Sequence, residues 1–150
     1  RSGLSGSRPV WPSSAFRCAP WIARTFLWGD YDTITLAAWV CTKYKNKEEM
    51  PQRIRNHECT HARQWVECMI ASGVIIWALV IFPGISSWWF CLSFLMFYVL
   101  YVLEYIVKLM FFGSEAYNRI SFEKEAYENQ YDDNYLENAG YFGWIRYLFN

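Results

Sequence analysis

The stretch "RNHECTHARQW", residues 55–65, holds the only two histidines of the chain, His57 and His61, with Glu58 directly after the first. Residues four positions apart share one face of an α-helix, so both imidazoles can reach a single metal ion. A glutamate beside them can activate a metal-bound water. The pattern HExxH therefore predicts a zinc site, with Zn²⁺ as the cofactor. The motif is short and also occurs without metal, so a polar helix turn is the alternative.

Catalytic zinc commonly takes three protein ligands and a water molecule, so one ligand is missing. Because the chain has no third histidine, that ligand should be a carboxylate. The later segment "SFEKEAYEN" offers Glu123, Glu125 and Glu128. Glu123 and Glu125 lie about 200° apart around a helix, so both cannot face one metal. The residues alone leave the choice open, and all three glutamates can also form a solvated face that balances nearby lysines.

The elements that would position these residues begin with a long apolar run, because no charged residue lies between Glu67 and Glu104. Pro83 and Gly84 break this run near its middle and predict a helical hairpin. The second half is long enough to cross a bilayer, whereas the first half is short unless it extends to Trp65. A buried hairpin in a soluble domain is the alternative, but so long an uncharged run is rare in a small soluble core.

Lysines and arginines flank the hairpin on both sides and are absent from its turn, which places both chain ends in the cytoplasm by the positive-inside rule. Trp88 and Trp89 stand beside the turn, as anchors at the opposite surface would. We expect residues 73–82 and 88–103 to lie in hydrocarbon. A hairpin returns the chain to the face that it left, so the glutamate-bearing segment should lie near the HExxH helix.

Several smaller features complete these expectations. Residues 33–41 are β-branched and apolar, and indicate a short strand or an interfacial segment. Pro51 suits the first turn of the HExxH helix, Gly113 should end the second apolar helix, and Ser121 should be the N-cap of a new one. Cys59 should lie on the far side of the helix from His57, and Gln64 can line the site. The i,i+4 pair of Arg63 and Glu67 should contribute a few tenths of a kcal/mol. A phenol that contacts an oxyanion could come from Tyr117, Tyr127, Tyr131 or Tyr135.

Length and composition limit the class of protein. A chain of 150 residues fits one domain, 29–150, preceded by a Ser-, Gly- and Pro-rich leader, 1–28. The zero net charge gives no indication of a nucleic-acid partner. Nine tryptophans favour a membrane interface. Five cysteines, an odd number with no CxxC, argue against a disulfide framework.

"HECTH", followed after an apolar hairpin by "SFEKEAY", resembles the gluzincin metalloproteases. It is most similar to the integral-membrane zinc endopeptidases of the CAAX-protease and heat-shock-protease type, in which a helix with the pattern F-E-x-x-A-D supplies the third ligand. Phe122, Glu123 and Ala126 match that pattern, so the resemblance implies Glu123, rather than Glu125, as the ligand. Tyr127 stands where the family has an aspartate that orients a histidine ligand, so that role is open here.

The chain is also similar to small bacterial membrane proteins with the pattern "NHExxHxxQ … NISFExEAY", over residues 33–147. The two resemblances imply a minimal gluzincin-like domain, embedded in the bacterial inner membrane with its site on the cytoplasmic side. The resemblance to the proteases implies a peptide or membrane-protein substrate of unspecified sequence, whereas the second resemblance implies no known substrate. The oligomeric state stays open.

Together these expectations describe an all-α membrane protein, with a transmembrane helical hairpin, a cytoplasmic-side helix and a short edge strand before the HExxH helix. The expected activity is zinc-dependent peptide hydrolysis, with His57, His61 and Glu123 as ligands and Glu58 as the general base. Three alternatives stay open. They are a catalytically inactive metal-binding membrane protein or interaction module, a soluble helical domain with a structural metal, and a membrane scaffold without metal.

Overall fold

The computed structural model describes residues 33–36, 39–42 and 50–149, with side chains from Met50 onward. The expected leader, 1–28, lies outside the described residues. The described part is mostly helical and has one small antiparallel pair of strands, β1 (Thr33–Leu36) and β2 (Trp39–Thr42). The segment expected to be one short strand therefore forms two, and both lie against the helix that carries the histidines.

That helix, α2 (Gln52–Ile81), is continuous over 30 residues and carries both the HExxH motif and the first apolar half of the hairpin. Pro51 directly precedes it, and the Pro51 carbonyl accepts hydrogen bonds from the backbone N–H groups of Ile54 and Arg55 at 3.0 and 3.2 Å. A helix of this length extends about 45 Å, more than the ~30 Å of bilayer hydrocarbon. The uncharged part of α2, residues 68–81, covers only about 21 Å of this length, so the first apolar half of the hairpin is short, although its helix continues without a break into the HExxH turn.

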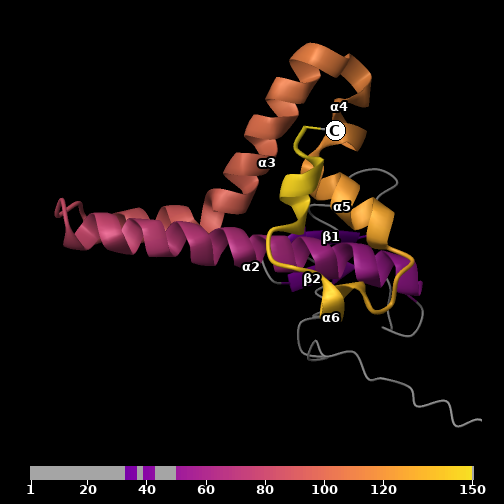
Figure 1. Ribbon diagram of the computed structural model, residues 1–150, viewed down its shortest axis with the longest axis horizontal. Helices are drawn as coiled ribbons and strands as arrows, with labels where there is room; N and C mark the ends of the chain where they lie inside the picture. Colours follow the sequence, from indigo (N-terminus) through magenta and orange to yellow (C-terminus); the bar gives the residue numbers. More distant parts are fainter. Residues whose placement is uncertain (1–32, 37–38, 43–49, 150) are drawn as a thin grey trace, which may run out of the picture.

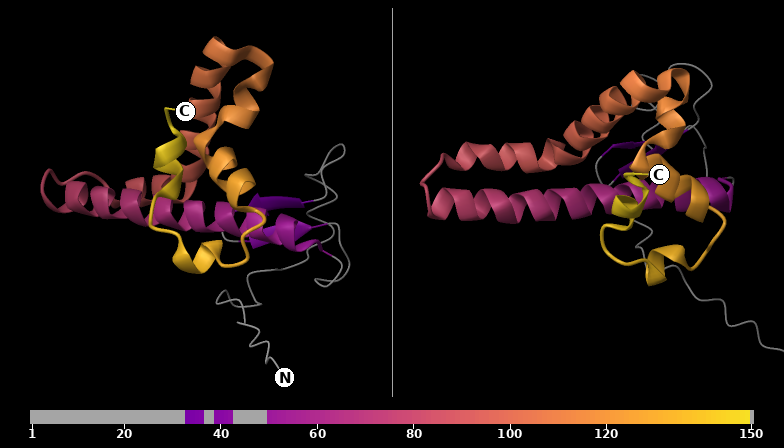
Figure 2. Two further views of the ribbon diagram at one scale, coloured as in Figure 1. Left: turned by 45° about the vertical axis from the view of Figure 1, so that its right-hand side comes forward. Right: turned by 45° about the horizontal axis from the view of Figure 1, so that its top comes forward.

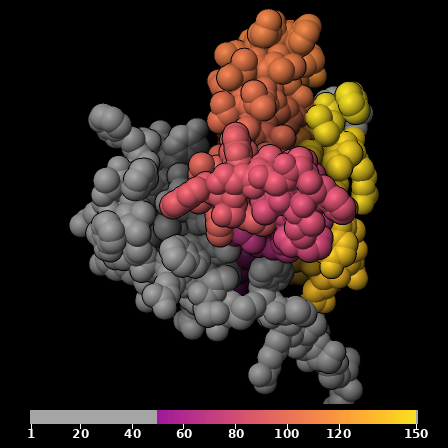
Figure 3. Space-filling model, turned by 90° about the vertical axis from the view of Figure 1, so that its left-hand side faces the viewer, coloured from indigo at the N-terminus to yellow at the C-terminus, as the bar shows by residue number. Residues whose placement is uncertain are grey.

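The hairpin turn contains Gly84 at φ 71°, a conformation that favours glycine. It is followed by the 3₁₀ helix η3 (Ser87–Trp89) and by α3 (Phe90–Phe112). α3 runs back beside α2 and then turns away from it, as Figures 1 and 2 show. The Trp65 indole N–H donates to the Phe94 carbonyl at 3.0 Å and ties the two helices together. Figure 3 views the molecule from the side of the hairpin tip, which projects towards the reader.

The chain then passes through η4 (Gly113–Glu115) and α4 (Ala116–Arg119) into α5 (Ser121–Asn129). Gly113, at φ 56°, ends α3 as expected. The expectation for Ser121 is wrong, because Ile120 occupies the N-cap position and Ser121 is the first helical residue. Glu104 of α3 accepts from the Ser121 backbone N–H at 2.8 Å and from its hydroxyl at 2.6 Å. A carboxylate from another helix therefore caps α5.

The core lies where α2, α3 and α5 meet. Its centre is Phe122, which is 1 % exposed. The Phe122 ring packs against Phe97 of α3 at 5.0 Å between ring centroids. It also packs at 4.5 Å against Trp144 of the C-terminal segment, residues 130–149. Ile120 and Ala126 are fully buried on the same side of α5. The short helix α5 is therefore held by its apolar side rather than by its own length.

The C-terminal segment contains α6 (Tyr135–Asn138) and the 3₁₀ helix η5 (Gly143–Tyr147), and it passes around α2 (Figure 1). Near the start of α2, the Asn56 side-chain amide donates to the Gln130 carbonyl and to the Asp133 carboxylate, each at 3.1 Å. One turn beyond the HExxH motif, the buried Arg63–Glu67 pair holds the same segment. The C-terminal segment therefore contacts α2 on both sides of the histidines.

The Arg63–Glu67 pair, which the sequence predicts to contribute only a few tenths of a kcal/mol, is buried. Arg63 Nε lies 2.9 Å from Glu67 Oε1, and both residues are buried. The Phe142 backbone N–H donates to Glu67 Oε2 at 3.0 Å, and the Arg63 guanidinium donates to the Gly140 carbonyl. The sequence spacing identified the pair but could not show that the C-terminal segment covers it.

Two helical stretches, Gln52–Ile81 and Ser87–Asn129, are long and apolar enough to cross a membrane by length and composition. The start of α2 is polar and buried beneath other elements, whereas its second half exposes large apolar side chains. These exposed residues are Ile70, Val74, Ile75, Trp77, Leu79 and Ile81. Nearly the whole length of α3 does the same, with Phe94, Leu95, Val99, Val102, Leu103, Ile106, Val107, Leu109, Met110, Phe111 and Phe112. Exposed apolar surface of this extent is typical of a surface that contacts a membrane or another protein.

Candidate metal centre

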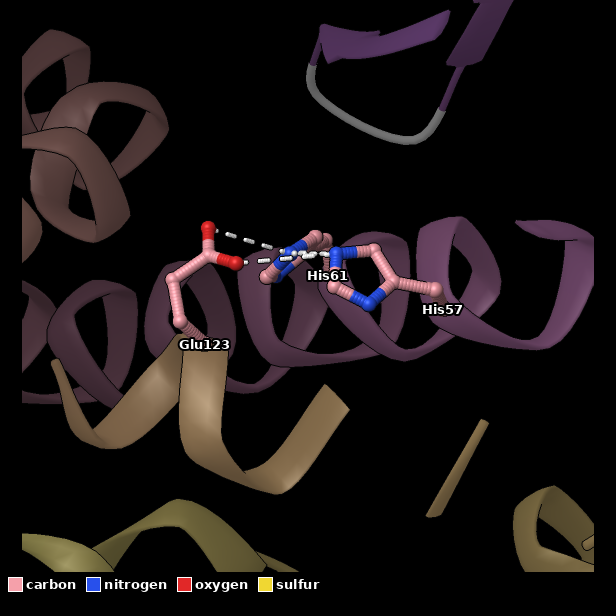
Figure 4. A group of neighbouring side chains, drawn as sticks. All are labelled: His57, His61 and Glu123. Atoms are coloured by element: carbon pink, nitrogen blue, oxygen red, sulfur yellow. Dashed lines mark hydrogen bonds and ion pairs between the residues drawn. The ribbon is translucent and has the colours of Figure 1, made fainter. Parts of the chain in front are cut away.

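The structure brings His57, His61 and Glu123 together, with their side chains converging between α2 and α5 (Figure 4). The two Nε2 atoms lie 3.1 Å apart. Glu123 Oε1 is 3.4 Å from His61 Nε2, and Glu123 Oε2 is 3.6 Å from His57 Nε2. One ligand atom from each residue lies within 4.8 Å of the others. This group could hold a metal ion.

Local folding explains the convergence. The helical period of α2 places both imidazoles on one face. Glu123 lies in the first turn of α5, next to the buried Phe122. The cap that Glu104 provides at Ser121 fixes the start of α5, and the burial of Phe122 fixes its rotation. The Glu123 carboxylate is therefore aimed at the histidines by contacts from α3 and from the core.

The donor atoms of this group fit a zinc ion. Glu123 is 4 % exposed and His61 is 8 % exposed, so water is largely excluded. Glu123 Oε2, which faces the histidines, is buried and has no hydrogen-bond partner among the described residues. His57 Nδ1 has none either, but the atom of that ring that faces the group is Nε2. Buried lone pairs that converge without donors are costly unless a cation or proton lies between them. Two imidazoles and one glutamate also form a donor set that catalytic zinc uses.

The electrostatics of the group link its three members. Burial, followed by repulsion from His61, lowers the pKa of His57. Burial alone would lower the pKa of His61, but the hydrogen-bonding and negative charge of Glu123 raise it above its ordinary value. Burial alone would raise the pKa of Glu123, yet the contact with His61 brings it below its ordinary value. Without metal, therefore, the carboxylate and the second histidine attract a shared proton into the site.

Glu58 is buried beside the group but is not one of its three convergent members. Its negative charge opposes the lowering of the His57 pKa and adds to the raising of the His61 pKa. Glu58 therefore lies outside the set of residues that could hold a metal ion.

Tyr101 of α3 is a site residue that sequence reasoning missed. Its hydroxyl donates to Glu123 Oε1 at 2.8 Å. A signal was present, because Tyr101 precedes Glu104 by three positions and so shares its face of the helix. Among the tyrosines that the sequence singled out, Tyr127 packs edge-on against the His57 ring at 4.6 Å. An aromatic contact thus lies where the family resemblance implied an orienting aspartate.

The rival glutamates occupy different environments. Glu125 is buried but accepts hydrogen bonds from Gln64 Nε2 at 2.7 Å and from the Tyr135 hydroxyl at 2.6 Å, rather than joining the histidines. Glu128 is exposed. The alternative of a solvated glutamate face is therefore wrong for Glu123 and Glu125. Cys59 is buried and does not belong to the convergent group.

No protein-family model, no curated protein and no solved structure matches this chain. The resemblance to gluzincins therefore remains a hypothesis carried by the short motifs. Any functional conclusion depends on the site itself.

Proposed function

We propose that this protein is a zinc-dependent membrane metallopeptidase. His57, His61 and Glu123 would hold Zn²⁺, and Glu58 would be the general base. One observation carries the proposal: the HExxH histidines converge with a buried carboxylate from a helix 62 residues further along the chain (His61 to Glu123), beside a glutamate outside that set.

When bound, zinc would supply Lewis-acid polarisation of the scissile carbonyl and a lowered pKa for the attacking water. The residues of the chain would manage the proton. Glu58 would take it from the water as the oxygen attacks the carbonyl carbon, and would then deliver it to the leaving amine as the C–N bond breaks. The Tyr101 hydroxyl, through its hydrogen bond to Oε1, would fix the orientation of the Glu123 carboxylate.

We propose further that the hairpin crosses the bilayer, with residues 73–82 and 88–103 in hydrocarbon and both chain ends in the cytoplasm. The exposed apolar side chains of α2 and α3 and the absence of charge from the hairpin turn support this. His61 precedes Cys68, the start of the uncharged run, by only about 10 Å along the helix axis. The substrate would therefore be a peptide segment near the cytoplasmic membrane surface.

The metal content of the purified protein in detergent tests the ligand set. The wild type should retain stoichiometric zinc after dialysis, and His61→Ala and Glu123→Gln should lose most of it. Glu128→Gln is the matched control, because it makes the same change on the same helix at an exposed position. A wild type without bound metal, or a control that loses as much as Glu123→Gln, would remove the basis of the proposal. Zinc binding without hydrolysis of any peptide or membrane-protein substrate would leave the catalytically inactive alternative.

A further inference from the structure

Gln64 links the candidate metal centre to a second buried group. Its side chain is 1 % exposed and lies one turn beyond His61 on α2. Its Nε2 donates to the Phe122 carbonyl at 3.1 Å and to Glu125 Oε2 at 2.7 Å. Its Oε1 lies 2.8 Å from His61 Nδ1. The Gln64 side-chain amide therefore makes all three contacts at the same time.

The orientation of this amide follows from its partners. A backbone carbonyl can only accept, so the NH₂ group of Gln64 must face Phe122. The amide oxygen must then face His61 Nδ1, and because an amide oxygen cannot donate, Nδ1 must carry the hydrogen. In the neutral ring, Nε2 is left with its lone pair. That lone pair points towards Glu123 and His57, as a metal ligand requires.

Glu125 is in turn held from its other side. The Tyr135 hydroxyl donates to Glu125 Oε1 at 2.6 Å. Gly143 of the C-terminal segment lies so close that a Cβ atom there would collide with the Glu125 carboxylate and lie 3.2 Å from the Tyr135 hydroxyl oxygen. The carboxylate therefore has little freedom to move, and neither has the Gln64 amide that it accepts from.

We propose that Glu125 is a positioning residue that acts through Gln64 to hold His61 in the Nδ1–H tautomer, with Nε2 free for the metal. The expected effect of Glu125 on zinc affinity rests on the proposed function, whereas its expected effect on the tautomer of His61 does not. This role also explains why α5 carries two buried glutamates spaced by two residues. Glu123 would bind the metal, and Glu125 would fix the orientation of His61, the histidine ligand that Gln64 contacts.

The tautomer can be measured directly in the metal-free protein. Histidine-selective ¹⁵N labelling gives few signals, because the chain has only two histidines, and His57→Ala assigns them. At a pH where both rings are neutral, His61 of the wild type should be protonated at Nδ1. Gln64→Met should move the proton to Nε2, because Glu123 still faces that nitrogen and Nδ1 has lost its acceptor. Glu125→Ala should weaken the preference for Nδ1, because only the Phe122 carbonyl then holds the Gln64 amide. The zinc affinity of both variants should fall by about 10- to 100-fold, the usual effect of losing a residue that orients a ligand.

Glu125→Gln is the conservative variant. Its amide oxygen can still accept from Gln64, and its NH₂ group can donate to the Tyr135 oxygen, so the Nδ1–H signal should be retained. Glu128→Gln should behave as the wild type. A merely structural role of Glu125 would lower stability without moving the ring-nitrogen signals, so stability and tautomer are read on the same samples. If Glu125→Ala does not fold, Glu125→Met takes its place, because methionine fills more of the same space and still removes the acceptor for Gln64.

Two results would overturn the proposal. One is a wild-type His61 protonated at Nε2 in its neutral form. The other is a folded Gln64→Met or Glu125→Ala protein that keeps the wild-type distribution of tautomers. A wild type with the expected tautomer but no affinity for zinc would instead refute the proposed function and leave the positioning role in place. The two failures are thus distinguishable.

Discussion

Removing Glu67 should destabilise the protein far more than its sequence position suggests. An exposed i,i+4 ion pair contributes about 0.3–0.5 kcal/mol. Here Arg63 and Glu67 are both buried, and Glu67→Ala would leave the guanidinium without its carboxylate and the Phe142 N–H without its acceptor. Breaking a buried pair in this way costs about 3–5 kcal/mol. That is roughly ten times the effect of an exposed pair with the same spacing.

The chain contains such an exposed pair as a matched control. Arg119 Nη2 lies 3.2 Å from Glu115 Oε2, again with i,i+4 spacing, but the Glu115 side chain is 69 % exposed. Unfolding in detergent micelles, followed by tryptophan circular dichroism as SDS is added, would compare Glu67→Ala with Glu115→Ala. Equal midpoints for the two variants would refute the reasoning, because it attributes the larger cost of Glu67→Ala to the burial of the pair and to the lost acceptor of the Phe142 N–H.

Burial also predicts what happens when both partners are removed. Burial raises the pKa of Glu67 even though Arg63 opposes the shift, so the ionised carboxylate is disfavoured at this position. An apolar pair, Arg63→Leu with Glu67→Leu, should therefore recover part of the stability that Glu67→Ala loses. A double variant less stable than Glu67→Ala would show that the pair itself, rather than the unpaired charge, determines the cost.

Three further outcomes are expected. Glu58→Gln should keep zinc and lose peptide hydrolysis, because the amide cannot accept the proton of the water; loss of the metal would show that Glu58 is a ligand instead. In sealed vesicles, a cysteine at Ser86 should be labelled from the side opposite to a cysteine at Asn134, and labelling from one side would exclude the hairpin topology. In the metal-free protein, His61 contributes its full stability below its unfolded pKa, and this contribution is lost as pH rises through its raised folded pKa. Glu123 contributes its full stability above its unfolded pKa, and this contribution is lost as pH falls through its lowered folded pKa. The stability difference between the wild type and Glu123→Gln should therefore be largest between the ordinary pKa values of 4.5 and 6.5 and shrink on either side, and a difference that keeps growing into alkaline pH would contradict the direction of both shifts.

The parts of the site that follow from local rules were predictable from the sequence. The helical period alone places His57 and His61 on one face. The usual ligand count of zinc then requires a carboxylate, and the hairpin returns the chain to deliver one. Each step needs only spacing and composition, and the structure does bring Glu123 to the two histidines.

The choice between the two glutamates could not be made from spacing. Phe122 and Ala126 form the apolar side of α5, and Glu123 and Glu125 lie on its two flanks. One flank meets the histidines, and the other meets Gln64 and the C-terminal segment. Helical geometry says that the two glutamates point in different directions, but not which direction faces the metal. That depends on contacts with residues far away in the sequence.

The same limit applies to the burial of charged groups. Glu104, Glu67 and Glu125 each look like surface glutamates in the sequence, yet each accepts a hydrogen bond from the backbone or side chain of another element. Such a role becomes visible only when the partner is known. The donors of these bonds lie on α5, on the C-terminal segment and on α2.

The precision of the candidate metal centre must therefore come from tertiary contacts. α5 has only nine residues, too few for a helix to be stable by itself in water. Its position depends on the Glu104 cap from α3, on the burial of Phe122 and on the bond between Glu125 and Gln64 of α2. Because each anchor belongs to a different element, Glu123 reaches the histidines only when the hairpin and the C-terminal segment are both in place. Closure of this small domain should accordingly be one cooperative event that also assembles the candidate metal centre before any metal is bound.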